Sequence, residues 1–347
     1  MPETVVVTGA SAGLGRAIAV EFARHGAQVA LLARGQKGLE GAAAEVQAAG
    51  GKALIVPTDV ADPAAMESAA EITEKHFGPI DIWVNNAMAS VFSPVKEMKA
   101  EEYKRATEVT YLGFVYGTLA ALHRMLPRDR GMIVQVGSAL AYRSIPLQSA
   151  YCAAKHAIRG FNDSLRCELL HDKSKVRVTM VQMPAMNTTQ FGWVKSRLQK
   201  KAQPVPPIFE PEVGARAVYW AAHHHRREVY VGSSTVKAIV GNKVAPDMLD
   251  HYLASKGYEA QQTSEPEDPA RPNNLWEPVD ADQDHGCHGT FDARSHEHSA
   301  QLALDLNLPK ALGLAFAGAL AGSVLLSMRR RSQNHQRDHA EIERRAA

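Results

Sequence analysis

The sequence of 347 residues has only three cysteines, which are Cys152, Cys167 and Cys287. They are too few for a disulfide framework and favour a reducing compartment. A strong charge of either sign is also lacking, because 39 Lys and Arg residues nearly balance 37 Asp and Glu residues. A formal net charge of +2 gives no overall basic field and argues against a nucleic-acid partner. The N-terminus has no charged region followed by a long apolar core, so we expect no signal peptide.

Residues 1–255 show a regular alternation of strand and helix patterns. The composition, 45% hydrophobic and 22% charged, is that of a globular protein. Short β-branched runs alternate with longer segments of helical period, such as residues 14–25 and 151–170. Repeated units of this kind predict an α/β fold, a doubly wound and mainly parallel sheet with helices on both faces. Seven strands are expected, at residues 4–8, 28–33, 53–57, 81–85, 132–136, 177–181 and 229–231.

The composition changes after residue 255. Between residues 259 and 308 there are eleven acidic residues against two basic ones, and long apolar runs are missing. Four prolines in this stretch interrupt any helix. Residues 256–308 are therefore expected to form an acidic, largely irregular linker that lies partly along the surface of the first domain.

Residues 311–328 are an uncharged run of 18 residues, bounded by Lys310 and by three arginines at 329–331. As a helix, the run would be about 27 Å long, close to the roughly 30 Å of a hydrocarbon core. We expect a transmembrane helix at 309–330, a polar tail at 331–347, and a membrane-associated protein whose catalytic domain lies in the cytosol. The positive-inside rule would place the three arginines in the cytosol too, which a single span cannot satisfy together with a cytosolic domain. We favour a cytosolic domain with a short translocated tail, and a buried helix or a segment in the membrane plane stays an alternative.

A glycine-rich turn joins the first expected strand to the first expected helix. It reads Thr-Gly-Ala-Ser-Ala-Gly-Leu-Gly and has glycines at positions 9, 13 and 15. A bound phosphate needs several backbone N–H groups with no Cβ in the way, and the dipole of a helix N-terminus favours the negative charge. The turn therefore predicts a nucleotide-binding site.

Tyr151 and Lys155 have the i,i+4 spacing that places two side chains on one face of a helix. A nearby ammonium favours phenolate and is expected to lower the pKa of the tyrosine. Ser138 ends a strand and is able to hydrogen-bond a substrate oxygen. Such a set suits a proton transfer that accompanies hydride transfer to a carbonyl. A lone tyrosine–lysine pair, in contrast, is equally typical of an ordinary helix surface.

The glycine turn, Asn85-Asn86-Ala87, Ser138 and the Tyr151–Lys155 pair come in the order and at the spacings of one family. With them, residues 1–255 resemble the short-chain dehydrogenase/reductase family. The resemblance implies a Rossmann-type domain and an oxidoreductase that acts on a small-molecule carbonyl or alcohol, as a homodimer or homotetramer. Tyr151 would be the general acid/base, Ser138 would orient the substrate, and Lys155 would tune the tyrosine and bind the nicotinamide ribose.

The resemblance also implies a set of cofactor contacts. These are Gly9, Ser11, Gly13, Leu14, Gly15, Arg34, Asp59, Val60, Asn86, Ala87, Tyr151, Lys155, Pro184 and Thr188. At the end of the second strand of such a fold, an acid would repel a 2′-phosphate, whereas a guanidinium suits it. The sequence has Arg34 and no acid there, and Ser11 is a second donor to the same phosphate. We therefore predict NADP(H) rather than NAD(H), the alternative being that Arg34 is a solvated surface residue.

Two departures from the family pattern qualify these expectations. Thr110 stands where the family usually has an asparagine that helps to hold a proton-relay water, and Met88 replaces a common glycine. Thr110 supports the alternative of a membrane-tethered nucleotide-binding scaffold or redox sensor with weak or no turnover. We expect no metal site, because the histidines around Cys287 lack a regular ligand framework.

Overall fold

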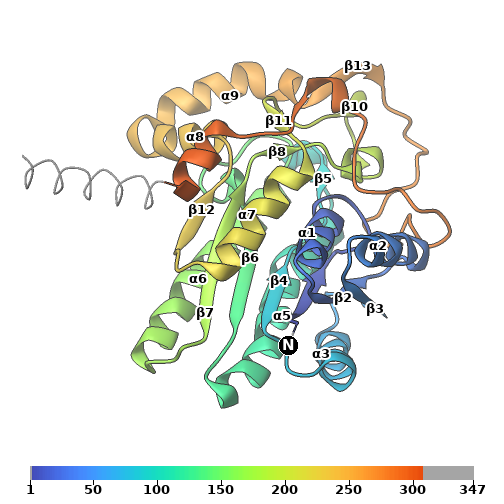
Figure 1. The fold of residues 1–347 in the computed structure, drawn as a ribbon. Helices are drawn as coiled ribbons and strands as arrows, with labels where there is room; N and C mark the ends of the chain where they lie inside the picture. Colours follow the sequence, from blue (N-terminus) through green and yellow to red (C-terminus); the bar gives the residue numbers. More distant parts are fainter. Residues whose placement is uncertain (1, 308–347) are drawn as a thin grey trace, which may run out of the picture. The chain divides into compact units, whose positions relative to one another are not determined.

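The computed structural model describes residues 2–307, and its centre is a sheet of seven parallel strands in the order β12-β7-β6-β4-β1-β2-β3 (Figure 1). The expected α/β fold is thus confirmed. The strands are β1 (Thr4–Thr8), β2 (Gln28–Ala33), β3 (Lys52–Pro57), β4 (Ile82–Asn85), β6 (Met132–Ser138), β7 (Arg177–Met183) and β12 (Glu228–Tyr230). Strand order reverses beside β1, and in such sheets ligands bind at the carboxyl ends of the strands near this point.

Helices cover both faces of the sheet. On one face α1 packs against α2 and α7, and on the other α5 packs against α3 and α6 (Figure 1). The helices are α1 (Gly13–Arg24), α2 (Gln36–Ala48), α3 (Pro63–Phe77), α4 (Ala100–Thr107), α5 (Gly113–Met125), α6 (Ser149–His171), α7 (Pro211–His223), α8 (Ser233–Val244) and α9 (Pro246–Ala260).

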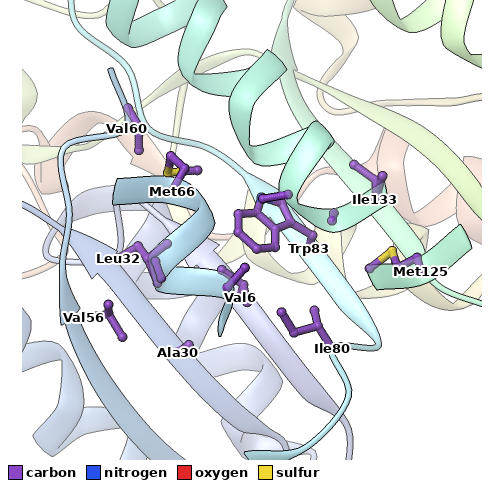
Figure 2. Close-up of a cluster of buried hydrophobic side chains, with 14 of the residues drawn as sticks. Val6, Ala30, Leu32, Val56, Val60, Met66, Ile80, Trp83, Met125 and Ile133 are labelled. Carbon is purple, nitrogen blue, oxygen red and sulfur yellow. The ribbon is translucent and has the colours of Figure 1, made fainter. Parts of the chain in front are cut away.

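The core follows from strands that are apolar on successive residues. All five residues of β1 are buried, as a strand covered on both faces requires. Figure 2 shows Val6, Leu32 and Ile133 from three of these strands around the indole of Trp83, all four of them fully buried. The polar atom of that indole is satisfied, because Trp83 Nε1 donates to Asn85 Oδ1 at 2.8 Å. Burial on both faces therefore fixes these strands in the centre of the sheet.

Residues 256–299 belong to the same compact unit as the residues before them. This differs from the expected boundary at 255, which α9 crosses without a break. Much of 261–299 is irregular, as expected, but it also forms strands that pair with earlier parts of the chain. The short strands are β5 (Val91–Phe92), β8 (Ala185–Met186), β9 (Lys195–Ser196), β10 (Lys200–Ala202), β11 (Ile208–Phe209), β13 (Gln262–Pro266) and β14 (Ser295–His296).

The physical reason for this packing is the burial of two large apolar residues of the acidic segment. Leu275 is fully buried and Phe291 is 7% exposed, so both transfer apolar surface from water into the domain. Between residues 2 and 307, no helix is long and apolar enough to cross a membrane. The expected membrane helix at 309–330 and the tail at 331–347 lie outside the described residues, so the membrane association stays a prediction.

Candidate active site

The glycine-rich turn connects β1 to α1 and is held against the end of β4. A Cβ on Gly15 would lie 2.1 Å from the carbonyl oxygen of Gly9, so no side chain fits at this position. Asn86 Nδ2 donates to Thr8 O at 3.0 Å, and Thr8 Oγ1 accepts from the backbone N–H groups of Asn86 and Ala87 at 2.8 and 3.1 Å. Asn86 therefore positions the turn from the neighbouring strand.

One cavity of about 740 Å³ opens at the carboxyl ends of the parallel strands. This volume falls within the roughly 300–1,000 Å³ of small-molecule sites. The structure brings every residue that the sequence singled out for catalysis or cofactor binding to the lining of this cavity. They are Gly9, Ser11, Gly13, Leu14, Gly15, Arg34, Asp59, Val60, Asn86, Ala87, Ser138, Tyr151, Lys155, Pro184 and Thr188.

Ser138, Tyr151 and Lys155 meet at the inner end of the cavity. Ser138 is the last residue of β6, and its side chain accepts a hydrogen bond from Leu140 N at 3.1 Å. Tyr151 lines the same part of the chain's cavity as Ser138, and the Ser138 side chain acts to lower the pKa of the Tyr151 phenol. Lys155 Nζ lies 5.5 Å from the centroid of the Tyr151 ring and donates to Val136 O at 2.7 Å. Two hydroxyl groups and an ammonium are thus gathered at one place.

Burial dominates the ionisation of this trio. It raises the pKa of the Tyr151 phenol, and the hydrogen bond with Ser138 offsets only part of the rise. It also lowers the pKa of Lys155 from 10.5 to about 7. The expected lowering of the pKa of Tyr151 is therefore not what the structure shows. The ammonium of Lys155 is itself buried and only partly charged at neutral pH, and it points toward the carbonyl of Val136.

Thr110, which departs from the family pattern, lies in one turn of π-helix at Glu108–Leu112 between α4 and α5. Single π-turns of this kind are frequent at functional sites. The fully buried hydroxyl of Thr110 donates to Ala89 O and accepts from Ala89 N, both at 2.9 Å. The hydroxyl thus holds the loop after β4, next to the cavity, both as a hydrogen-bond donor and as an acceptor.

Thr188 supplies a test of whether the cavity fits a dinucleotide. Its side chain is 7% exposed, and within residues 2–307 its Oγ1 atom has no hydrogen-bond partner. Leaving a buried hydroxyl without a partner costs roughly 1–3 kcal/mol. The Thr188 side chain stands beside Gly13 of the phosphate-binding turn, with its Cβ and Cγ2 atoms nearest to that glycine. A polar ligand that extends from this turn toward Tyr151 would satisfy the hydroxyl, so the residues fit such a ligand.

The segment at 190–207, part of which lines the cavity, is held by strand pairs and by a buried acid. β9 pairs with β5, and β10 pairs with β13. The Glu102 carboxylate, 1% exposed, is 2.7 Å from Arg197 Nη2 and 3.0 Å from Lys195 Nζ. These basic groups therefore face the domain interior. No sequence motif singled out Glu102, whose carboxylate also accepts from Lys99 N at 2.9 Å at the start of α4.

The largest difference from expectation is a segment that lies beside the nucleotide half of the cavity, residues 274–289, here named the strap. Its residues Asn274, Val279 and Asp280 line the cavity. Arg34, expected to meet a phosphate, donates to the carbonyl oxygens of Trp276 and Asn274, both at 2.5 Å. No residue of the strap was expected in the site. The one available signal was the pair of glycines inside α2, a helix that has no evident need of them.

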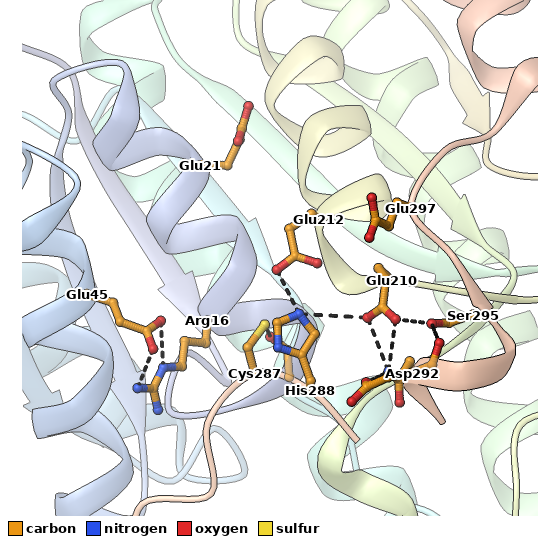
Figure 3. Close-up of polar contacts among 12 residues, drawn as sticks. Arg16, Glu21, Glu45, Glu210, Glu212, Cys287, His288, Asp292, Ser295 and Glu297 are labelled. Atoms are coloured by element: carbon orange, nitrogen blue, oxygen red, sulfur yellow. Dashed lines mark hydrogen bonds and ion pairs between the residues drawn. The ribbon is translucent and has the colours of Figure 1, made fainter. Parts of the chain in front are cut away.

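A cluster of Glu212, Cys287 and His288 joins the end of the strap to the start of α7 (Figure 3). Their candidate ligand atoms lie within 4.8 Å of one another. The three side chains make an ion pair and a hydrogen bond. His288 Nε2 pairs with Glu212 Oε1 at 3.0 Å, and Cys287 Sγ donates to Gly13 O at 3.2 Å. Burial raises the pKa of the Cys287 thiol, which keeps it protonated.

The geometry agrees with what comparison with known proteins finds. The family model described as short chain dehydrogenase matches residues 3–198. This chain belongs to the short-chain dehydrogenase/reductase family. An uncharacterized oxidoreductase of Bacillus subtilis (strain 168), YxnA, is 31% identical over 277 residues, which are 79% of this chain and 78% of that protein. The chain is thus a member of a family of oxidoreductases.

Two further relatives of this short-chain dehydrogenase carry more specific names. A fatty acyl-CoA reductase of Acinetobacter baylyi is 29% identical over 258 residues, covering 74% of this chain and 84% of that protein. An alcohol dehydrogenase of the archaeon Thermococcus sibiricus, solved with 5-hydroxy-NADP, has a TM-score of 0.58 and 28% identity. That likeness covers 67% of this chain and 95% of the archaeal one.

Proposed function

We propose that this short-chain dehydrogenase is an NADP(H)-dependent oxidoreductase that transfers a hydride between the nicotinamide and a carbonyl or alcohol substrate. The observation that carries the proposal is that Ser138, Tyr151 and Lys155 line one cavity, with Lys155 Nζ 5.5 Å from the centroid of the Tyr151 ring. This trio lies in the same cavity as a turn that only glycine can form. A proton donor and a phosphate-binding turn at two ends of one cavity suit a dinucleotide-dependent reaction.

In the proposed mechanism the chain controls the proton and the bound cofactor supplies or accepts the hydride. Tyr151 is the general acid in reduction, and its raised pKa keeps the phenol protonated and ready to donate at neutral pH. Ser138 hydrogen-bonds the substrate oxygen and orients it toward that phenol. In oxidation Tyr151 accepts the proton instead, and a charged Lys155 favours the phenolate that this requires.

The proposed preference for NADP(H) rests on Arg34, which follows β2 where an acid would select a free 2′-hydroxyl. The solved archaeal relative binds a derivative of NADP. The unpaired hydroxyl of Thr188 is a suitable donor or acceptor for the carboxamide at the other end of the cofactor. A higher kcat/KM with NADPH than with NADH is the expected result.

The proposed substrate is hydrophobic, because the lining of the cavity is mostly apolar. The relative from Acinetobacter is named for a substrate with a long acyl chain, which is consistent with this proposal. The apolar side chains of the cavity lining include Phe92, Leu140, Ile145, Phe191, Leu249 and Leu253.

The test is Tyr151→Phe, which removes one hydroxyl and keeps the ring. NADPH consumption is measured with a panel of aliphatic and aromatic aldehydes and ketones, and NADPH binding is measured by fluorescence. We expect kcat to fall at least about 100-fold, since general acid catalysis contributes factors of this size, while the Kd for NADPH stays within about twofold. Tyr258→Phe, at an exposed tyrosine, is the matched control. Tight NADPH binding without turnover in the wild type would favour a nucleotide-binding scaffold instead.

A further inference from the structure

The strap pairs with the N-terminal turn of α2 through its backbone. The N–H of Gly38 donates to the carbonyl of Asp280 at 3.1 Å, and the N–H of Lys37 donates to that of Ala281 at 3.3 Å. In Figure 1 the chain after β13 descends next to α2 before it returns toward β11. The strap thus uses N–H groups of the first turn of a helix, which have no partner within the helix itself.

Two anchors hold the strap on either side of this turn. On one side Leu275 is fully buried in the core, and its carbonyl accepts from Arg105 Nε at 3.0 Å. On the other side Arg16, only 4% exposed, holds Asp284 through two hydrogen bonds of 2.5 and 3.1 Å. The same guanidinium binds Glu45 of α2 (Figure 3). Arg16 therefore fixes the strap to both α1 and α2.

Between these anchors the Asp280 carboxylate enters a cradle that two glycines leave open. A Cβ on Gly35 would lie 1.8 Å from Asp280 Oδ1, and a Cβ on Gly38 would lie 2.6 Å from Asp280 Oδ2 and 2.9 Å from Ser11 Cβ. Asp280 is only 8% exposed in this position. The carboxylate lies where Arg34, Ser11 and the N-terminus of α2 would receive a 2′-phosphate, and its charge acts on Arg34.

The glycines of α2 recur where the strap approaches. A Cβ on Gly41 would lie 2.1 Å from Asp284 Oδ2, so Gly35, Gly38 and Gly41 together make room for two strap aspartates. A glycine inside a helix costs roughly 0.5–1 kcal/mol relative to alanine. Gly38 and Gly41 bring this cost twice in a helix of 13 residues. The packing of the strap into the space left by these glycines compensates for their cost in helix stability.

We propose that Asp280 stands in for the 2′-phosphate of NADP(H), so that the strap and the 2′-phosphorylated cofactor compete for the pocket formed by Ser11, Arg34 and the first turn of α2. This inference rests on the function proposed above. A carboxylate and a phosphate cannot share one anion site, because like charges at contact distance repel strongly in a partly buried place. The strap must leave before the phosphate enters, and its departure also frees the guanidinium of Arg34.

A different role for Asp280 makes opposite predictions. An acid that stays in place would accept a hydrogen bond from the free 2′-hydroxyl of NAD(H), as acids do at the end of the second strand in other dinucleotide sites. Loss of that acid would weaken NADH binding. Under the competition proposed here, the same loss strengthens NADPH binding and leaves NADH nearly unchanged.

The experiment compares the full-length wild type with Asp280→Asn and with the control Asp282→Asn. The control removes the same charge from an exposed position two residues away. The Kd is measured for NADPH, NADH, 2′,5′-ADP and 5′-AMP. We expect Asp280→Asn to bind NADPH and 2′,5′-ADP about tenfold more tightly, which is the scale of one screened charge near a dianion. NADH and 5′-AMP should change less than twofold, and the control should change none of the four.

Gly41→Ala provides a second variant that leaves the nucleotide pocket intact, because Gly41 does not line the cavity. Its methyl group would displace Asp284 and loosen the strap, so it should also tighten the binding of 2′,5′-ADP. Gly160→Ala is the matched control, since a Cβ at this helical glycine meets nothing within 4 Å. Hydrogen exchange of the strap amides gives a direct readout, and 2′,5′-ADP should accelerate it whereas 5′-AMP should not.

Each outcome separates the two proposals. Unchanged NADPH affinity in Asp280→Asn and Gly41→Ala, or slower exchange of the strap with 2′,5′-ADP, would overturn the competition and leave the oxidoreductase function intact. Weaker NADH binding in Asp280→Asn would assign the acid to a ribose hydroxyl and overturn it as well. If no variant binds any dinucleotide, both the proposed oxidoreductase function and the proposed competition between the strap and the 2′-phosphate are refuted.

Discussion

The buried ammonium of Lys155 leads to a prediction about stability and pH. Its pKa is lowered from 10.5 to about 7 because burial penalises the charged form. Between these two values the unfolded chain binds more protons than the folded one, so the free energy of unfolding rises with pH. The slope reaches about 1.4 kcal/mol per pH unit for one group. Below about pH 7 both states are protonated, and the contribution of Lys155 no longer changes with pH.

Lys155→Met isolates this contribution, because methionine keeps the apolar stem and removes the charge. The wild-type free energy of unfolding minus that of the variant should rise by roughly 3 kcal/mol between pH 7 and 9.5. Loss of the hydrogen bond to Val136 O adds an offset of about 1–3 kcal/mol that does not depend on pH. Urea unfolding without cofactor, at constant ionic strength, measures the difference. Lys175→Met, at an exposed lysine, controls for the replacement itself. A Lys155→Met difference as flat as that of the control would refute the burial of the charge.

Two further predictions concern groups that hold the cavity walls. Burial raises the pKa of Glu102, but hydrogen bonds from Arg197, the N–H of Lys99 and Lys195 bring it down to about 2. This stabilisation is complete above the unfolded pKa of 4.5 and is lost as the pH falls toward 2, so Glu102→Gln should cost about 2–4 kcal/mol at pH 7 and less at pH 3.5 in urea unfolding. Thr110→Val should lower the free energy of unfolding by about 1–3 kcal/mol, because it leaves both backbone groups of Ala89 without their partner. A thermal melt with an unchanged Tm would contradict this role of the hydroxyl.

The sheet was predictable because its strands carry local signals. β1 and β2 begin and end at the predicted residues, since apolar runs buried on both faces are distinct from amphipathic helices. β6 and β7 each extend two residues beyond the prediction, to Ser138 and Met183. These extra residues end at the cavity, where polar side chains and a proline follow the apolar run. The pattern therefore identifies a strand better than it identifies the end that carries function.

The positions of the site residues were predictable for a similar reason, because each belongs to a short motif next to a strand or on one helix. Their ionisation was not, since burial is a property of the whole fold. The spacing of Tyr151 and Lys155 predicts a charge close to a phenol. It does not show that both groups are buried deeply enough for desolvation to outweigh their interaction.

The position of the strap could not be predicted from the sequence. Its acids and prolines are typical of an irregular linker, and irregular it largely is, yet its contacts join residues more than two hundred positions apart. The information that places it is divided between two segments, neither of which is unusual by itself. Only the glycines at positions 35, 38 and 41 indicate the position of the strap. Their spacing of three leaves room for another segment along one side of α2, but it does not identify that segment. Glycines inside a helix therefore indicate that another segment packs closely against it. Here that segment contributes Asp280, which we propose occupies the site of the 2′-phosphate.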